Sequence, residues 1–475
     1  MSTPPPLAGG AHGPDALRPL LATTLDALCQ GATARRGPLP AGGPAAVTDR
    51  LRTAALPLLP EHGEGAETAL RTLVHALAEG TADPADPLCA AHLHCPPLAV
   101  AAAADLAASA LNPSMDSWDQ APAASALEAL LTRTLTALIH ENGDALVTTG
   151  GTEANQLALL LAREHPTTQG PPRLLIGANA HHSLARATWL LGLPAPHVIP
   201  TPTGALDPAA LDEALTTLAD RPGTPLVAAT AGTTDAGLID PLDDIADVCA
   251  THTARLHIDA AYGAGLLFSD ARKHLVHGIH RADTVTLDLH KLGWQPAAAG
   301  LLAVREPTDL TALTHSADYL NADDDTEAGL PDLLGRSLRT TRRPDILKIA
   351  VTLKALGRQG LGALVDHVCD RAHELAALID KHPRLELHAT PTISTVLFRP
   401  TDADDHDIAH LRRHLLDLGA AVLGRADLAG QRWLKATLLN PHTRTEDLTE
   451  LLARVDHHHH PAPTTPHPTE GTTRR

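Results

Sequence analysis

Lys291 is the residue whose type and position best suit covalent chemistry. The chain contains only six lysines, so few side chains can act as an amine nucleophile. Lys291 follows the alternating segment 285–289, which predicts a strand, and a lysine in that position is seldom buried unless it is paired or reactive. A desolvated amine of this kind can form a Schiff base with an aldehyde. The other five are expected on the surface or, for Lys435, in a strand far from this region: Lys273, Lys348, Lys354, Lys381 and Lys435.

Asp259 ends a second apolar run, residues 256–258, and small residues follow it. A carboxylate in this position is expected to be partly buried, and a buried charge needs a partner. The protonated nitrogen of a pyridine ring is one partner with the required charge. The alternative interpretation is that Asp259 caps the turn after the strand.

Two further groups follow predicted strands. Residues 150–155 read Gly-Gly-Thr-Glu-Ala-Asn between a strand and a helix, so glycine backbone, helix amides and Thr152 can approach an anion. The segment lacks the spacing of nucleotide-binding loops, and Thr152 as an ordinary helix cap is an equal alternative. His181 follows the strand-like segment 173–179, where an imidazole can stack on a flat ring or serve a structural role.

Taken together, these positions supply an anion cradle, a ring-stacking imidazole, a carboxylate for a ring nitrogen and an amine for an aldehyde. Open α/β sheets bind ligands where the carboxyl ends of their strands meet. Pyridoxal 5′-phosphate has a matching group for each of the four features. The residues therefore predict a pyridoxal phosphate site, although each feature alone is a weak signal.

The segments that must position these residues alternate between strand-like and helical patterns from about residue 111 to 310. This alternation predicts an α/β fold whose largely parallel sheet is covered by helices on both faces. The C-terminal part is predicted to be a smaller α/β domain. The predicted division is a disordered segment 1–15, an N-terminal helical segment 16–110, a large domain 111–343, a small domain 344–455 and a disordered tail 456–475.

The composition limits the partners and the location of the protein. The formal net charge is −18 and basic residues form no block, which argues against a nucleic-acid partner. No apolar run reaches the ~18–20 residues of a membrane span, and the N-terminus does not resemble a secretory signal. Five scattered cysteines without a CxxC pair are typical of the cytoplasm. The histidine run 457–460 is expected to bind metal only adventitiously, so no metal site is predicted.

Nine ordered motifs between about residues 85 and 455 resemble the group II pyridoxal-dependent decarboxylases of fold-type I, and among them the diaminobutyrate and lysine decarboxylase branch. The motifs are CAAHLHCPP, NPSMDSWDQAPAASALE, GGTEAN, AHHSLARA, TAGTTDAGLIDPLDDIA, HIDAAYG, DLHKLGWQP, SLRTTRRPDILK and LKATLLNPHT. The resemblance implies an amino-acid α-decarboxylase with pyridoxal 5′-phosphate as cofactor. It also implies a mostly parallel seven-stranded sheet and an intertwined homodimer with the active site at the interface.

The resemblance further implies a role for each matching residue. Lys291 is similar to the lysine that binds the cofactor, Asp259 to the carboxylate that keeps the ring nitrogen protonated, and His181 to the stacking histidine. The positions that hold the phosphate correspond to Gly151, Thr152, Asp288 and His290, and those that flank the ring to Thr233 and Ala261.

The source of the proton that replaces the lost carboxylate differs from part of that family. Aromatic and glutamate decarboxylases carry a loop tyrosine suited to this task, whereas the corresponding position here is Leu333. The expected proton donor is therefore His290 or a water molecule.

The expected substrate is a diamino acid such as 2,4-diaminobutyrate or lysine, used in bacterial secondary metabolism. The acidic segment 323–325 is a candidate contact for the distal ammonium, although a solvated loop is the simpler interpretation. The alternative substrate is an acidic amino acid, free or tethered to an acyl carrier protein as a thioester.

Three other functional classes are weighed against a decarboxylase. A pyridoxal phosphate aminotransferase or an oxidative deaminase would use the same fold and cofactor. A non-enzymatic relative would be expected to lose Lys291 or Asp259, and both are present. A metal hydrolase centred on residues 92–95, His-Leu-His-Cys, would need a carboxylate at helical spacing, which the segment lacks.

Overall fold

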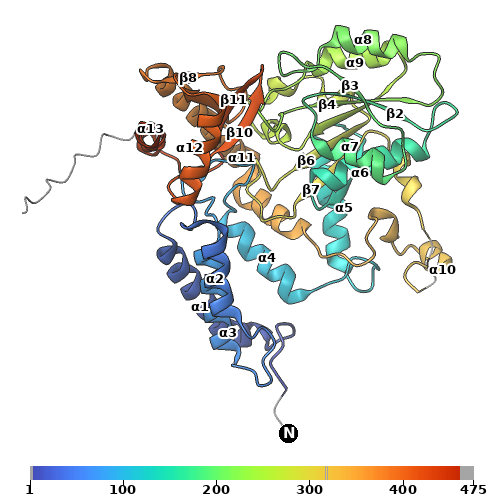
Figure 1. The fold of residues 1–475 in the computed structure, drawn as a ribbon. Coiled ribbons are helices and arrows are strands. Elements are labelled where there is room, and N and C mark those ends of the chain that lie inside the picture. Colours follow the sequence, from blue (N-terminus) through green and yellow to red (C-terminus); the bar gives the residue numbers. More distant parts are fainter. Residues whose placement is uncertain (1–3, 316, 318, 461–475) are drawn as a thin grey trace, which may run out of the picture.

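The computed structural model describes residues 4–315, 317 and 319–460, which form a large sheet domain, a small sheet domain and an N-terminal group of helices (Figure 1). The strand order of the large sheet is β1-β7-β6-β5-β4-β2-β3. β7 pairs antiparallel with β1 and β6, and the remaining pairs are parallel, which confirms the predicted sheet. Its strands are β1 Asp144–Thr148, β2 Arg173–Gly177, β3 His197–Ile199, β4 Pro225–Thr230, β5 Arg255–Ala260, β6 Thr284–Asp288 and β7 Gly300–Val304.

Helices cover both faces of this sheet because its buried strands expose apolar side chains on both sides. In β2, Leu174 and Ile176 pack with α6 and α7, whereas Leu175 belongs to the core beneath α5, α8 and α9. This is the alternation of side chains that a strand imposes. The helices of this domain are α5 Pro122–Thr136, α6 Gly151–Glu164, α7 His182–Leu190, α8 Pro208–Thr217 and α9 Leu242–Thr251.

Short helical turns complete the large domain and connect it to the next. They are η1 Gly263–Phe268, η2 Lys273–Val276, η3 Ile279–Arg281, η4 Pro307–Leu313, α10 Asp323–Glu327 and η5 Leu334–Arg336.

The N-terminal segment is helical, as predicted. Its first three helices pack mainly on one another and extend away from the two sheets in Figure 1, where they are blue. The fourth packs against α11, the long helix that follows the large domain. The elements are α1 Gly13–Arg35, α2 Gly43–Ala55, α3 Ala66–Gly80, α4 Ala99–Leu111 and α11 Ile346–Asp380.

The small domain follows α11, which bends at Gly357, where the backbone has φ 64° and ψ 177°. This bend divides α11 into two helical stretches. The small sheet is antiparallel throughout, in the order β10-β11-β9-β8, and has its own apolar core. Its elements are β8 Leu385–Leu387, β9 Thr395–Pro400, α12 Asp405–Asp417, β10 Gly424–Leu428, β11 Gln431–Thr437 and α13 Thr445–His459.

The structure differs from several sequence-based expectations. α1 begins at Gly13, inside the predicted disordered segment 1–15, and α13 continues to His459, inside the predicted tail. Residues 1–3 and 461–475 lie outside the described residues. Lys348 was expected on the surface, which is wrong: it is buried, with Nζ 3.2 Å from Asp105 Oδ1 and 3.3 Å from Asp345 Oδ1. Within the described residues, no helix combines the length and apolar character needed to cross a membrane.

Candidate active site

A cavity of about 360 Å³ lies at the C-terminal ends of β1, β4, β5 and β6. The loops after parallel strands meet at this edge of the sheet, so residues distant in sequence come together there. Its lining includes Leu93 and His92 from the segment before α4 and Lys435 from β11 of the small domain. The large-domain residues that line it are Thr149, Gly150, Gly151, Thr152, His181, Thr230, Gly232, Thr234, Asp259, Ala261, Tyr262, Asp288, His290 and Lys291.

Lys291 lies at this cavity directly after β6, next to a buried carboxylate. Its Nζ is 3.1 Å from Asp288 Oδ2, and His290 Nε2 is 3.5 Å from the same oxygen. The other oxygen of Asp288 has no hydrogen-bond partner among the described residues. A carboxylate that holds the lysine ammonium also repels a phosphate, so the geometry pairs Asp288 with Lys291 more directly than with an anion.

The turn between β1 and α6 brings its backbone close to the side chains that line the cavity. Gly150 has φ 147°, a conformation that glycine alone adopts readily. A Cβ at Gly150 would lie 3.0 Å from His290 Cε1, and one at Gly151 would lie 3.2 Å from Asp288 Oδ2. The first amides of α6 follow this turn, and helix N-termini favour anions. Gly151 and Thr152 therefore line a site suited to a phosphate.

Asp259 is buried at the end of β5 and is held by uncharged donors. Its Oδ1 accepts the backbone N–H of Ala261 at 3.1 Å, and its Oδ2 accepts the Asn155 amide at 2.7 Å. The Asn155 carbonyl oxygen in turn accepts from Thr286 Oγ1 at 2.8 Å and from His257 Nε2 at 3.0 Å. Burial lowers the pKa of His257 to about 4, so this imidazole is neutral near pH 7. None of these contacts pairs the Asp259 carboxylate with a cation, so its charge is available to a ligand in the cavity.

His181 precedes α7 and is tied to the same network. Its Nδ1 accepts the Ser183 hydroxyl at 2.8 Å and the Ser183 backbone N–H at 3.3 Å. Ser183 Oγ accepts the Asn155 amide at 2.9 Å. Burial lowers the pKa of His181, so its ring is a neutral flat surface beside the cavity.

These groups fit pyridoxal phosphate. The cavity of about 360 Å³ and the unsatisfied oxygen of Asp288 show that the site has room and polar groups for a further molecule. Asp259 offers the negative charge that a protonated ring nitrogen needs, and Lys291 offers the amine that an aldehyde needs.

Two expectations about the cavity differ from the structure. Thr233 does not line it: its hydroxyl accepts the backbone N–H of Leu238 at 3.0 Å, and the residue borders a neighbouring cavity instead. Lys435 was expected to be far from the site, which is wrong, because it lines the cavity and its Nζ donates to the Thr234 carbonyl at 2.9 Å. A lysine inside the apolar run of β11 carries the same signal that identified Lys291, so the sequence could have indicated it.

The other residues considered for proton transfer or substrate binding lie away from the cavity or are already hydrogen-bonded. Leu333 is buried outside it, and the acidic residues 323–325 form the exposed helix α10. Tyr262 lines the cavity, but its hydroxyl bonds to Ser394 Oγ at 2.8 Å and Thr395 Oγ1 at 3.1 Å. Burial raises the pKa of this tyrosine to about 12, which makes it a poor proton donor.

Residues 51–401 match the pyridoxal-dependent decarboxylase conserved domain. The chain is 38% identical over 410 residues to an L-2,4-diaminobutyrate decarboxylase of Rhizobium meliloti (strain 1021), covering 84% of this chain and 83% of the relative. It is 30% identical to an acidic amino acid decarboxylase of Homo sapiens, covering 73% of each. The glutamate decarboxylase domain of a diaminobutyrate-pyruvate transaminase and L-2,4-diaminobutyrate decarboxylase from Vibrio parahaemolyticus superposes with a TM-score of 0.85 at 30% identity, covering 96% of this chain and 97% of that one.

Proposed function

Since the chain belongs to the family of pyridoxal-dependent amino-acid decarboxylases, we propose that its substrate is a free L-diamino acid, with L-2,4-diaminobutyrate first and lysine second. The products are then the corresponding amine and CO₂. The main support for this substrate is the 38% identity to an L-2,4-diaminobutyrate decarboxylase over most of both chains. The motifs NPSMDSWDQ, SLRTTRR and LLNP favour the same branch.

The cavity supports a division of roles among its residues. In this proposal Lys291 binds the cofactor, Gly151 and Thr152 hold its phosphate with the α6 amides, and His181 stacks on its ring. When bound, pyridoxal phosphate supplies the aldehyde that takes the substrate amine and the ring that accepts the electrons of the breaking bond. Asp259 keeps a proton on the ring nitrogen, and this charge strengthens the pull on those electrons.

Ala261 follows the strand that carries Asp259 and lines the cavity, and it is proposed to flank the ring. A Cβ at Gly151 would lie 3.0 Å from Ala261 Cβ, so the two small residues face one another across a narrow gap. Asp288 holds the Lys291 amino group when that group is not bonded to the cofactor.

Lys435 is proposed to bind the carboxylate that the reaction removes. It is the second lysine at the cavity; burial lowers its pKa, and a carboxylate bound beside it would favour the charged form again. The charge of a carboxylate disappears as CO₂ forms, so a cation at this position contributes mainly to substrate binding.

His290 is proposed to return the proton to Cα, directly or through water. Its ring is at the cavity, and its neighbour Asp288 can hold an Nε2 proton. Tyr262 is excluded from this role by its bonds to Ser394 and Thr395.

An acidic amino acid, free or tethered to an acyl carrier protein, is the second candidate substrate. The carboxylates that line the cavity are Asp259 and Asp288, which already have roles, whereas Lys435 and His92 offer positive or donor groups. A distal ammonium therefore has no obvious counter-ion among the lining residues, whereas a distal carboxylate could take Lys435 in place of the α-carboxylate. The human relative named as an acidic amino acid decarboxylase adds support.

The proposal places the enzyme in the cytoplasm of a bacterium, in secondary metabolism, as a homodimer. The arm formed by α1, α2 and α3 extends from the body and exposes several leucines, which favours burial against a second copy. Leu51, Leu58 and Leu77 are 42%, 73% and 63% exposed.

Substrate preference is tested with purified full-length protein loaded with pyridoxal phosphate. Free diaminobutyrate, lysine, aspartate and glutamate, and an aspartyl carrier-protein thioester, are each offered while CO₂ and amine are measured. Diaminobutyrate is expected to give the highest kcat/KM and equal amounts of amine and CO₂. Faster CO₂ release from aspartate or from its thioester would make the acidic amino acid the substrate. A keto acid or aldehyde product would show that the reaction is not a decarboxylation.

The lysine assignment is tested in the same preparation. Hydride reduction should fix the cofactor on the peptide that contains Lys291, and Lys435→Met should leave this label in place. A label on Lys435 would overturn the assignment of the two lysines.

A further inference from the structure

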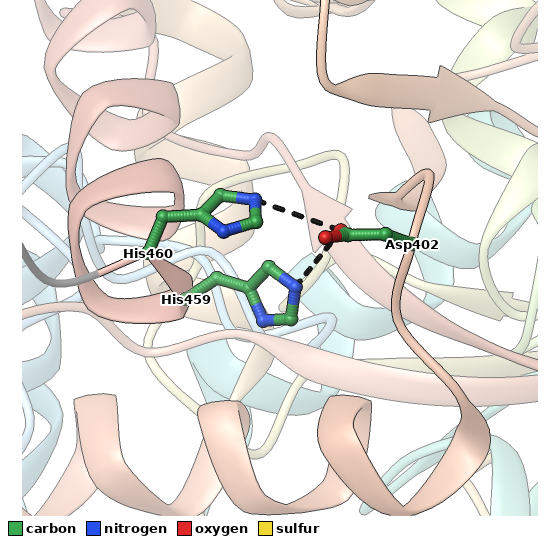
Figure 2. Close-up of side chains that lie close together, drawn as sticks. All are labelled: Asp402, His459 and His460. Atoms are coloured by element: carbon green, nitrogen blue, oxygen red, sulfur yellow. Dashed lines mark hydrogen bonds and ion pairs between the residues drawn. The ribbon is translucent and has the colours of Figure 1, made fainter.

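The end of α13 meets the turn after β9 on the surface of the small domain. Figure 2 shows the side chains of His459 and His460 directed at the carboxylate of Asp402. His459 Nε2 is 3.1 Å and His460 Nε2 is 3.5 Å from the same oxygen, Asp402 Oδ1. One ligand atom from each of the three residues lies within 4.8 Å of the other two.

These distances match the edges of a metal coordination sphere. Ligands that bind a tetrahedral ion at about 2.0–2.1 Å are about 3.3 Å from one another. The two measured separations, 3.1 and 3.5 Å, lie on either side of that value. A small movement of the side chains would thus place an ion between the three atoms.

The two imidazoles are held against the domain. The side chains of His459 and His460 are 14% and 32% exposed, so neither behaves like a solvated tail. His460 Nε2 is out of contact with solvent and makes no hydrogen bond to any residue that the structure describes. A buried imidazole nitrogen without a partner is the kind of group that a metal ion satisfies.

We propose that Asp402, His459 and His460 form a binding site for a borderline divalent transition-metal ion, Zn²⁺ in the first place, with water as the fourth ligand. Two imidazoles and one carboxylate suit such an ion, whereas Mg²⁺ and Ca²⁺ prefer all-oxygen sites. The carboxylate of Asp402 neutralises one of the two charges of the ion, so the complex keeps one net positive charge. The nearby Arg384 is already paired with Asp456.

The bound ion would join two segments of the small domain that are distant in sequence. Asp402 follows β9, whose first residue Thr395 contacts Tyr262 of the large domain, and α13 packs on α11 and α12. None of the three ligands lines the active-site cavity. The ion therefore stabilises the folded small domain and takes no part in decarboxylation.

A second group on the same surface has another explanation. Asp404, His406 and Asp407 also lie close together, but the two carboxylates form the capping box of α12. Asp404 Oδ1 accepts the backbone N–H of Asp407, and Asp407 Oδ2 accepts that of Asp404. Substitution in this second group therefore serves as the control for Zn²⁺ binding at Asp402, His459 and His460.

Zn²⁺ binding to the full-length, cofactor-loaded protein is measured by competition with a chromophoric chelator. We expect the wild type to bind one high-affinity Zn²⁺. Asp402→Asn, His459→Gln and His460→Gln should each weaken that affinity by about 100-fold or more, since even an indirect partner of a metal ligand is worth about 10–100-fold. Asp404→Asn and the double variant His457→Gln/His458→Gln should bind Zn²⁺ like the wild type.

The controls separate this site from a histidine run that binds metal by itself. Such a run would retain its affinity in Asp402→Asn and lose it in His457→Gln/His458→Gln, and either result overturns the proposal. No high-affinity Zn²⁺ in the wild type overturns it as well. Co²⁺ substitution adds a coordination signal: the intense visible bands of a tetrahedral ion should be present in the wild type and absent in Asp402→Asn. These readouts do not depend on decarboxylase activity.

Discussion

Asn155 joins the groups that are proposed to hold the cofactor ring. Its amide nitrogen donates to Asp259 and to Ser183, and its carbonyl oxygen accepts from Thr286 and His257. Because both ends of the amide are satisfied, its orientation is fixed, and so is the oxygen of Asp259 that it holds. The sequence marked this asparagine only as the end of the motif GGTEAN. Its role depends on contacts with three other segments, which a linear pattern does not contain.

Replacing Asp259 with Asn tests the charge at the ring nitrogen. A neutral amide cannot keep that nitrogen protonated, so kcat should fall about 100- to 1000-fold, as for other preorganised electrostatic groups. Cofactor content, measured by absorbance, should stay near the wild-type value. Asp240→Asn is the matched control, since Asp240 is equally buried but does not line the cavity. Activity of Asp259→Asn within tenfold of the wild type would remove this residue from its role.

Replacing Lys435 with Met tests the binding of the substrate carboxylate. Hydrogen bonds to charged groups contribute about 1.5–3 kcal/mol, so KM should rise about tenfold or more. kcat should change little, because the carboxylate loses its charge as the reaction proceeds. A KM increase for every amino acid tested indicates the α-carboxylate, and an increase for acidic substrates alone indicates a side-chain carboxylate. An unchanged KM for all substrates would contradict either role.

At the scale of elements, β1, β2, β4, β5 and β6 were predictable because each is a short apolar run that ends in glycine or polar residues. β3 has three residues, two of them exposed, so it carries almost no apolar signal. β7 was not predicted: residues 300–304 are apolar and pair with the neighbouring β6, but their antiparallel pairing with β1 joins residues more than 150 apart in sequence. Long-range pairing of this kind has no local signature.

β7 also determines how close the turn between β1 and α6, at Gly150 and Gly151, lies to the sheet. A Cβ at Gly300 would lie 2.6 Å from Gly150 Cα and 2.7 Å from Gly150 N. Gly300→Ala should therefore displace the turn, lower the unfolding free energy by about 1–3 kcal/mol and weaken cofactor binding. Thermal unfolding and cofactor content after dialysis measure the two effects. Gly63→Ala is the control because its Cβ would have no atom within 4 Å. Equal cofactor retention in both variants would show that the turn tolerates the displacement.

At the scale of the whole molecule, the small domain completes the cavity. Tyr262 bonds to Ser394, the Trp294 indole donates to the Leu439 carbonyl, and Lys435 donates to Thr234. The sequence predicted each domain separately, and the residues at the ends of the large-sheet strands could be identified from it. It could not show how the domains pack on one another, which is why Lys435 and His92 were missed as cavity residues.

The buried histidines make the stability of the molecule depend on pH. Burial lowers the pKa of His257 and of His140 to about 4, below the value of about 6.5 in an unfolded chain. Between these values the unfolded state binds more protons than the folded state, so stability is full above about pH 6.5 and falls as the pH decreases toward 4. For the fully buried His257 the loss is at most about 3 kcal/mol.

Urea midpoints measured at intervals from pH 7 to pH 4 test this dependence. The wild-type midpoint should fall across the window, and the fall should be smaller in His257→Gln and in His140→Gln because neither variant has the imidazole to protonate. His257→Gln also disturbs Asn155, whereas His140 lies outside the cavity, so agreement between the two variants separates protonation from damage to the site. His442→Gln, at an exposed position, is the matched control and should follow the wild type. If the slopes of both buried-site variants equal that of the wild type, proton uptake by these histidines does not cause the acid sensitivity.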